Sequence, residues 1–126
     1  MKLHIDDSKT IEEIRNAFTA SFEYLKLEFF TKPHEVGEAS AKKDMIDENK
    51  TLGDIRKKHN EGDIIITADM LVSDVESAFE DKFGIHAQVF RKQNNVWLET
   101  TSSDHWTLAK QNETGEFMCS PAEYFF

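Results

Sequence analysis

Two stretches of the chain match each other without a gap, and this internal repeat limits the available folds more than any other feature. Residues 11–22 and 72–83 both carry apolar side chains at positions i, i+3, i+6, i+7 and i+11. That spacing forms one apolar stripe, so each stretch predicts an amphipathic α-helix. After a one-residue gap, residues 25–32 match residues 85–92. The alternation of apolar residues in both segments predicts β-strands with one buried face.

A short strand is predicted before each helix, over residues 2–6 and 63–67. The order strand, helix, strand therefore occurs twice, in halves at about residues 1–32 and 63–92, which predicts a duplicated βαβ unit. Two such units with right-handed crossovers pack most simply as a four-stranded sheet with both helices on one face. We therefore predict one α+β domain over residues 1–126, a ferredoxin-like two-layer sandwich.

Residue types at the predicted helix ends support these boundaries. Thr10 with Glu13 has the spacing of a capping box, and so has Thr51 with Asp54, which predicts a short helix over residues 52–59. Gly84 lies where a left-handed residue would end the second long helix.

Two further segments lie outside the repeat: a charged connection at residues 33–62 and a C-terminal extension at 93–126. In the extension, Asn94 and Asn95 predict a tight hairpin turn that leads to a fifth strand over residues 96–101. Ser103 or Asp104 is expected to cap a last short helix that runs to about residue 111.

Charge and cysteine content exclude several partner classes. The net charge of −9 repels phosphate backbones and anionic membranes, so neither nucleic acid nor a membrane is an expected partner. A single cysteine rules out an internal disulfide and suits a reducing compartment. The first residues lack an apolar signal core, and no run approaches a membrane span. These features predict a cytoplasmic protein.

Three segments carry a resemblance to a known group of proteins. LKLEFF at 25–30, TLGDIR at 51–56 and the run from Gln88 to Asn112 resemble an uncharacterised family of small bacterial proteins from Bacteroidetes-type genomes. The resemblance extends over roughly residues 10–115 and implies a bacterial, cytosolic origin. It implies no activity and no site residues, because none is assigned to the family.

Residue patterns that carry chemistry are few. No two of the five histidines have the i, i+4 spacing of a helical metal site, so no metal is predicted. The segment at 102–105, Ser-Ser-Asp-His, has hydrolase residue types, but adjacent side chains rarely face one another as a catalytic triad requires. No glycine-rich phosphate loop is present, and no cofactor is predicted. Catalytic residues are therefore not assigned, and enzymatic activity is not the expected role.

An aromatic sheet face is the most informative pattern. Strand alternation sends Phe30 and Phe90 to the face opposite the helices, and the hairpin register places Trp97 there as well. An open apolar face of this kind marks an interface. Two alternatives stay open, since the aromatic tail or the last helix, through Trp106 and Leu108, could cover the face. RNA binding is not favoured, because strands 2–6 and 63–67 carry no aromatic residue.

These observations predict a non-catalytic protein-interaction or assembly module. Its interface residues would be Phe30, Phe90 and Trp97, and its partner a second copy or another protein. The alternative is a small-molecule binding protein or small enzyme. Its pocket would lie between the sheet and the 33–62 connection, since long connections are often functional, with the polar lining His34, Arg56 and His59.

Overall fold

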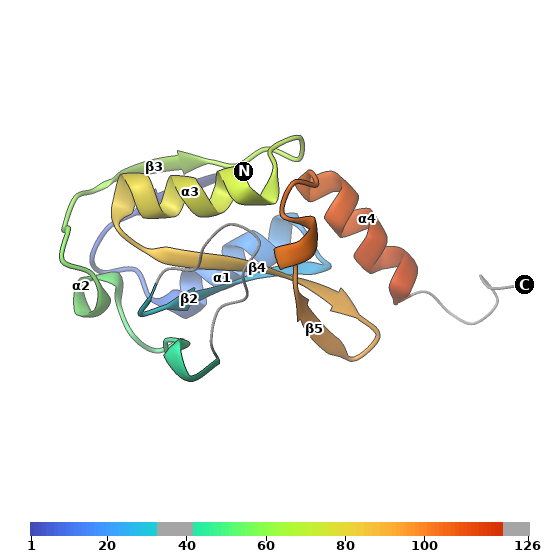
Figure 1. The fold of residues 1–126 in the computed structure, drawn as a ribbon. Coiled ribbons are helices and arrows are strands. Elements are labelled where there is room, and N and C mark those ends of the chain that lie inside the picture. Colours follow the sequence, from blue (N-terminus) through green and yellow to red (C-terminus); the bar gives the residue numbers. More distant parts are fainter. Residues whose placement is uncertain (33–41, 120–126) are drawn as a thin grey trace, which may run out of the picture.

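Helices and strands alternate along the chain in the computed structural model, which describes residues 1–32 and 42–119 (Figure 1). The strands are β1 (Lys2–Ile5), β2 (Leu25–Phe30), β3 (Gly62–Ile65), β4 (His86–Gln93) and β5 (Val96–Glu99). The α-helices are α1 (Ile11–Ser21), α2 (Leu52–Ile55), α3 (Val72–Phe83) and α4 (Leu108–Met118). Two 3₁₀ turns, η1 (Lys42–Asp44) and η2 (Thr101–Ser103), complete the described elements.

The described strands form two antiparallel sheets. β1 pairs with β3, while β4 lies between β2 and β5 in a three-stranded sheet. The α+β class is thus confirmed, but the single four-stranded sheet of the ferredoxin-like arrangement is not. Apolar alternation determines which face of a strand is buried, and it does not determine which strand lies beside it.

The two long helices supply the apolar stripes that the sequence predicted. α1 packs against β2 and α3 packs against β4. Phe29 of β2 meets Phe79 of α3 edge to face, with ring centroids 5.5 Å apart, and both side chains are fully buried. The strand pair β1–β3 adds Leu3, Ile5 and Ile64 to the same core.

The helix ends follow local chemistry, with two corrections. The short helix α2 ends at Ile55 rather than at the predicted residue 59. Both capping boxes, Thr10 with Glu13 and Thr51 with Asp54, are formed, and Gly84 is left-handed with φ of 66°. The last helix is different from the prediction: α4 begins at Leu108 after its cap Thr107. The predicted caps at 103 and 104 lie instead in and beside η2, and the helix continues past residue 111 to 118.

The two halves also share a pattern of backbone hydrogen bonds. After each half, a later helix begins where its first residues pair with the start of the long helix of that half: α2 pairs with α1, and α4 pairs with α3. The first half has Ile11 N to Lys50 O (3.0 Å) and Leu52 N to Lys9 O (2.9 Å). The second half has Val72 N to Trp106 O (3.0 Å) and Leu108 N to Met70 O (2.9 Å). The correspondence therefore reaches α2 and α4, beyond the segments that match in sequence.

Candidate functional site

The three predicted interface residues come together, but not as an open face. Phe30, Phe90 and Trp97 line one hollow of about 460 Å³. The hairpin register that places Lys92 opposite Trp97 is confirmed. However, Phe30 is 2% exposed and Phe90 is 8% exposed, so only Trp97 remains partly exposed. The prediction that all three form an exposed apolar patch is therefore wrong for the two phenylalanines.

The 33–62 connection is the physical reason for this burial. Its residues after 41 run back along the end of β2, where Thr31 N donates to Asp44 O (2.9 Å) and Ile46 N donates to Phe29 O (2.8 Å). Met45 forms a β-bridge with Phe30. The connection thus contributes to the cover that the sequence left open.

The two alternative covers have different outcomes. Trp106 lies against Arg91 and Lys110 rather than over Phe30, and Leu108 is fully buried in the main core. Of the aromatic tail, Phe117 is described and is 52% exposed. Tyr124, Phe125 and Phe126 lie outside the described residues.

The Lys26 side chain lies over two aromatic rings of this hollow, those of Phe90 and Trp97. The Lys26 ammonium is 5.3 Å from the Phe90 ring centroid and 5.1 Å from that of Trp97. It also pairs at 3.4 Å with Glu28, which is buried and takes a second cation, Arg15, at 3.0 Å. A cation at this distance from ring faces is held by the ring quadrupoles. The exposed part of Trp97 therefore carries positive charge beside it.

Exposed apolar side chains occur on the opposite face of the same hairpin. Val96 is 55% exposed and Leu98 is 39% exposed. Both belong to β5, the edge strand of the three-stranded sheet. In Figure 1 the β4–β5 hairpin extends away from α1 and α3. Sequence alternation alone could have placed Val96 and Leu98 together, but their exposure depends on what packs over that face of the sheet, which alternation does not indicate.

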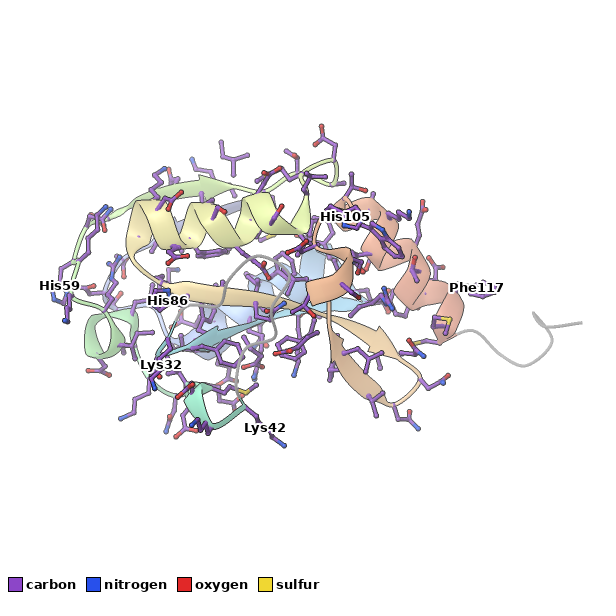
Figure 2. The ribbon with its side chains drawn as sticks, in the orientation of Figure 1. Lys32, Lys42, His59, His86, His105 and Phe117 are labelled. Atoms are coloured by element: carbon purple, nitrogen blue, oxygen red, sulfur yellow. The ribbon has the colours of Figure 1, made fainter. Side chains whose placement is uncertain are left out.

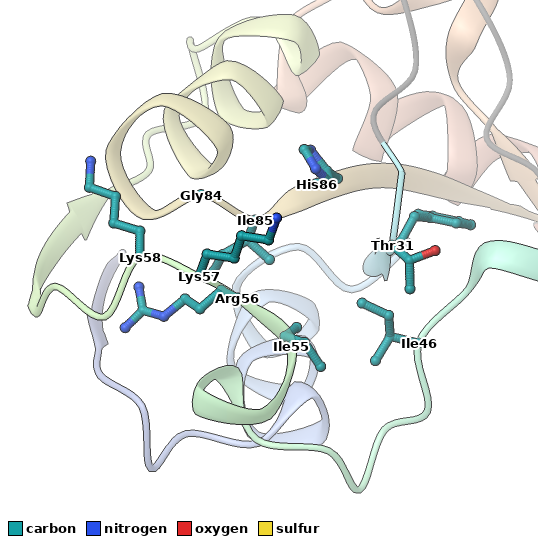
Figure 3. Close-up of a pocket in the computed structure, with 10 residues that line it drawn as sticks. Thr31, Ile46, Ile55, Arg56, Lys57, Lys58, Gly84, Ile85 and His86 are labelled. Carbon is teal, nitrogen blue, oxygen red and sulfur yellow. The ribbon is translucent and has the colours of Figure 1, made fainter.

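A second hollow lies where the alternative function predicted a pocket, between the sheet and the connection (Figure 3). It has a volume of about 370 Å³ and is lined by the end of β2, by residues 55–58 and by the start of β4. We call it the basic pocket, after its lining residues Arg56, Lys57 and Lys58. Of the three predicted residues, Arg56 lines it, His59 does not, and His34 lies outside the described residues.

Arg56 has a structural role that the sequence did not reveal. Its side chain is fully buried, and its guanidinium donates five hydrogen bonds. Two go to Asp7 Oδ1 (2.9 and 2.8 Å), two to the Oδ1 and carbonyl oxygen of Asn60, and one to the Phe83 carbonyl. Five is the full donor capacity of arginine. In Figure 3 the side chain accordingly points away from Thr31 and Ile46.

Asp7 bonds to both Arg56 and His59, two of the residues that the sequence predicted for the pocket lining. Its second carboxylate oxygen lies 2.8 Å from Nδ1 of His59, whose side chain is 55% exposed. The hydrogen bond from Arg56, followed by that from His59, lowers the pKa of Asp7 below its usual value. Asp7 is 49 residues from Arg56 in the chain, so no local pattern could have indicated this pair.

A third cluster surrounds His4 on the exposed face of β1–β3. Its Nδ1 lies 3.0 Å from Asp63 Oδ1, and its Nε2 lies 3.0 Å from Glu61 Oε1 and 3.5 Å from Asp6 Oδ2. The hydrogen bonds to Asp63 and then Glu61 raise the pKa of His4 above its usual value of 6.5. The ligand atoms of His4, Asp6 and Glu61 lie within 4.8 Å of one another, a spacing that a metal ion would also accept.

This cluster predicts a pH dependence of stability. Because the folded-state pKa of His4 is raised, its stabilising contribution is complete below the unfolded value of 6.5 and is lost as the pH rises through the folded pKa. We expect the wild type to exceed His4→Gln in free energy of unfolding by more at about pH 5.5 than at about pH 8.5. Urea unfolding at both pH values measures this difference. An equal difference at both would show that His4 is not held by these carboxylates.

Comparisons with known proteins give no family assignment. The chain matches no protein-family model, no curated protein and no solved structure. The resemblance to small Bacteroidetes-type proteins therefore stays a prediction. Within residues 1–32 and 42–119, no helix has both the length and the apolar character needed to span a membrane.

Proposed function

We propose that the protein is a non-catalytic protein-interaction module that binds through β5. One observation carries the proposal: this strand is the edge of its sheet, and its Val96 and Leu98 side chains are 55% and 39% exposed. A bare apolar edge is a template for strand addition, and proteins usually protect such edges unless they use them. The interface proposed here differs from the predicted face of Phe30, Phe90 and Trp97. Of these three residues it includes only Trp97.

The backbone of β5 supports strand addition. In a two-residue hairpin the residues that flank the turn, here Gln93 and Val96, bond to each other across the pair. Every second residue of β5 then turns its backbone N–H and C=O groups toward β4. The bond from Thr100 N to Val89 O (3.3 Å) agrees with this alternation, which assigns Val96, Leu98 and Thr100 to β4. The N–H and C=O groups of Trp97 therefore point to the outer edge. A partner strand would bond to them.

The partner that we propose is a second copy of this chain. Two β5 strands related by a two-fold axis would pair antiparallel, and a register centred on Trp97 sets Val96 of one copy beside Leu98 of the other. Apolar cross-strand pairs of this kind stabilise antiparallel strands. The net charge of −9 on each copy opposes association, so we expect a weak dimer that salt strengthens.

Sedimentation of the protein from micromolar to millimolar concentration tests this proposal. We expect a concentration-dependent dimer that the double variant Val96→Lys/Leu98→Lys abolishes. Ile65→Lys is the matched control, because Ile65 is 64% exposed but lies on β3. A protein that stays monomeric throughout, or a β5 variant that dimerises like the wild type, would overturn the proposal.

We also propose that the two halves arose by duplication and that the protein is cytoplasmic. Support for duplication comes from the matching hydrogen bonds between α1 and α2 and between α3 and α4. Support for a reducing compartment comes from the single cysteine. The ferredoxin-like sheet is not part of this proposal, because β1 and β3 form one sheet while β2 and β4 belong to another.

A further inference from the structure

We propose that the basic pocket binds a small molecule with an anionic head, a carboxylate or a phosphate, on an apolar body. This site is separate from the surface on β5. Figure 2 shows His59 and His86, on the pocket side, toward the opposite end of the molecule from Phe117 of α4. The inference therefore stands independently of the proposed self-association.

The charges around the pocket favour an anion. Its lining includes three basic side chains and no carboxylate, although the whole chain has 24 acidic residues against 15 basic ones. Arg56 is fully engaged elsewhere, and in Figure 3 the Lys58 ammonium points away from Thr31 and Ile46, so the exposed Lys57 remains as the cation that faces the pocket. Figure 3 shows the Lys57 ammonium toward Ile85 and His86 at the start of β4. An acid on α3, Glu80, lies beside the lining residue His86, with its Oε1 3.4 Å from His86 Nδ1.

The remaining wall of the pocket is apolar. Phe30, Ile46 and Ile85 are buried side chains that line it, and Ile55 is partly buried beside them. Thr31 adds a hydroxyl group to the lining, beside Ile46. The volume of about 370 Å³ falls in the range of about 300–1,000 Å³ found for small-molecule sites. A short acyl or aryl chain would therefore pack against the wall while its anionic head lies at Lys57, beside His86.

The backbone that carries the lysines is tied to neighbouring segments by Arg56. One hydrogen bond of Arg56, to the Phe83 carbonyl (3.2 Å), joins the loop after α2 to the end of α3, and its other four go to Asp7 and Asn60. Gly84 allows the close approach, because its φ is +66° and a Cβ there would lie 3.4 Å from the Cβ of Lys58. A site whose backbone is already ordered loses less conformational entropy on binding. This fixed loop distinguishes the pocket from scattered surface lysines.

Amide chemical shifts of the full chain, titrated with three probes, test the inference. The probes are octanoate, octyl phosphate and the uncharged octanamide. We expect saturable shifts at Thr31, Lys57 and His86 with both anions, and binding at least about tenfold weaker with octanamide. The relative affinity of the two anions then assigns the head as carboxylate or phosphate.

Paired variants complete the test. The double variant Lys57→Met/Lys58→Met should weaken octanoate and octyl phosphate binding at least about tenfold. Lys2→Met removes one charge from a side chain that is 67% exposed on β1, and it should leave binding unchanged. The inference is overturned if neither anion shifts the pocket amides, if octanamide binds as tightly as octanoate, or if the double variant binds like the wild type. Loss of dimerisation in β5 variants has no bearing on these results.

Discussion

Replacing Arg56 with methionine is expected to lower the free energy of unfolding by about 3 kcal/mol, because it removes one partner of a buried ion pair. The Arg56 side chain is fully buried and donates to Asp7, to Asn60 and to the Phe83 carbonyl. Its loss leaves these acceptors without their donor. We place the effect at the low end of the usual range, because the Asp7 side chain is 40% exposed and water can solvate it.

Urea unfolding of Arg56→Met beside Lys57→Met measures this effect. Lys57 is the next residue but is exposed, so its replacement should change stability by less than about 0.5 kcal/mol. A loss equal to that of Lys57→Met would show that the Arg56 contacts do not stabilise the fold.

Acid dependence gives a second readout of the same contact. The lowered pKa of Asp7 means that its contribution is present above the unfolded value of 3.8 and is lost as the pH falls through the folded pKa. The stability difference between wild type and Asp7→Asn should therefore shrink in acid. In the Arg56→Met background that acid dependence should be much reduced, because the largest cause of the lowered pKa is gone.

Local features of the sequence predicted the elements well. The apolar stripe of α3, which ends in Phe83, and the left-handed conformation of Gly84 both follow from interactions within a few residues. The same holds for the Asn94-Asn95 turn, where Asn94 has φ of 54°, and for the register that it sets. Such features need no knowledge of distant segments, because helix caps and tight turns are satisfied by their own neighbours.

Pairings between distant segments could not be predicted in the same way. Alternation placed Phe30 and Phe90 on one face, and that placement agrees with their shared hollow. What it could not indicate was that the connection would bond back to Phe29 and bury Phe30. A connection of mixed charge has no periodicity that shows where it packs. For this reason we propose β5, rather than the face of Phe30, Phe90 and Trp97, as the interface.

The pocket residues illustrate the same limit. Arg56 was predicted as a ligand contact because it is basic and lies in a long connection. The structure shows instead that all its donors are used by Asp7, Asn60 and the Phe83 carbonyl. Residue type and location indicated the region of the pocket. The division of roles between Arg56 and Lys57 depended on which side chain is buried.

Replacing Gly115 with alanine is expected to destabilise the fold by about 2 kcal/mol, although alanine favours a helix by about 1 kcal/mol over glycine. Gly115 is buried where α4 crosses the sheet. A Cβ there would lie 2.7 Å from the Cβ of Tyr24, 3.2 Å from Cγ of Arg91 and 3.3 Å from the Lys92 carbonyl oxygen. The first and last of these atoms are backbone or next to it, so the helix itself must shift.

Thermal and urea unfolding of Gly115→Ala beside Glu113→Ala test this expectation. Glu113 is exposed on the same helix, so its replacement by alanine should be close to neutral. The shift of α4 should also disturb the bond from Arg91 Nη1 to Gln111 Oε1 (2.9 Å), and the NMR signals of the Gln111 side-chain amide would report it. A Gly115→Ala protein as stable as the wild type would mean that α4 does not pack this closely on β4. Because β5 lies beside β4, a displaced helix would also change the exposure of Leu98, and the β5 interface depends on that exposure.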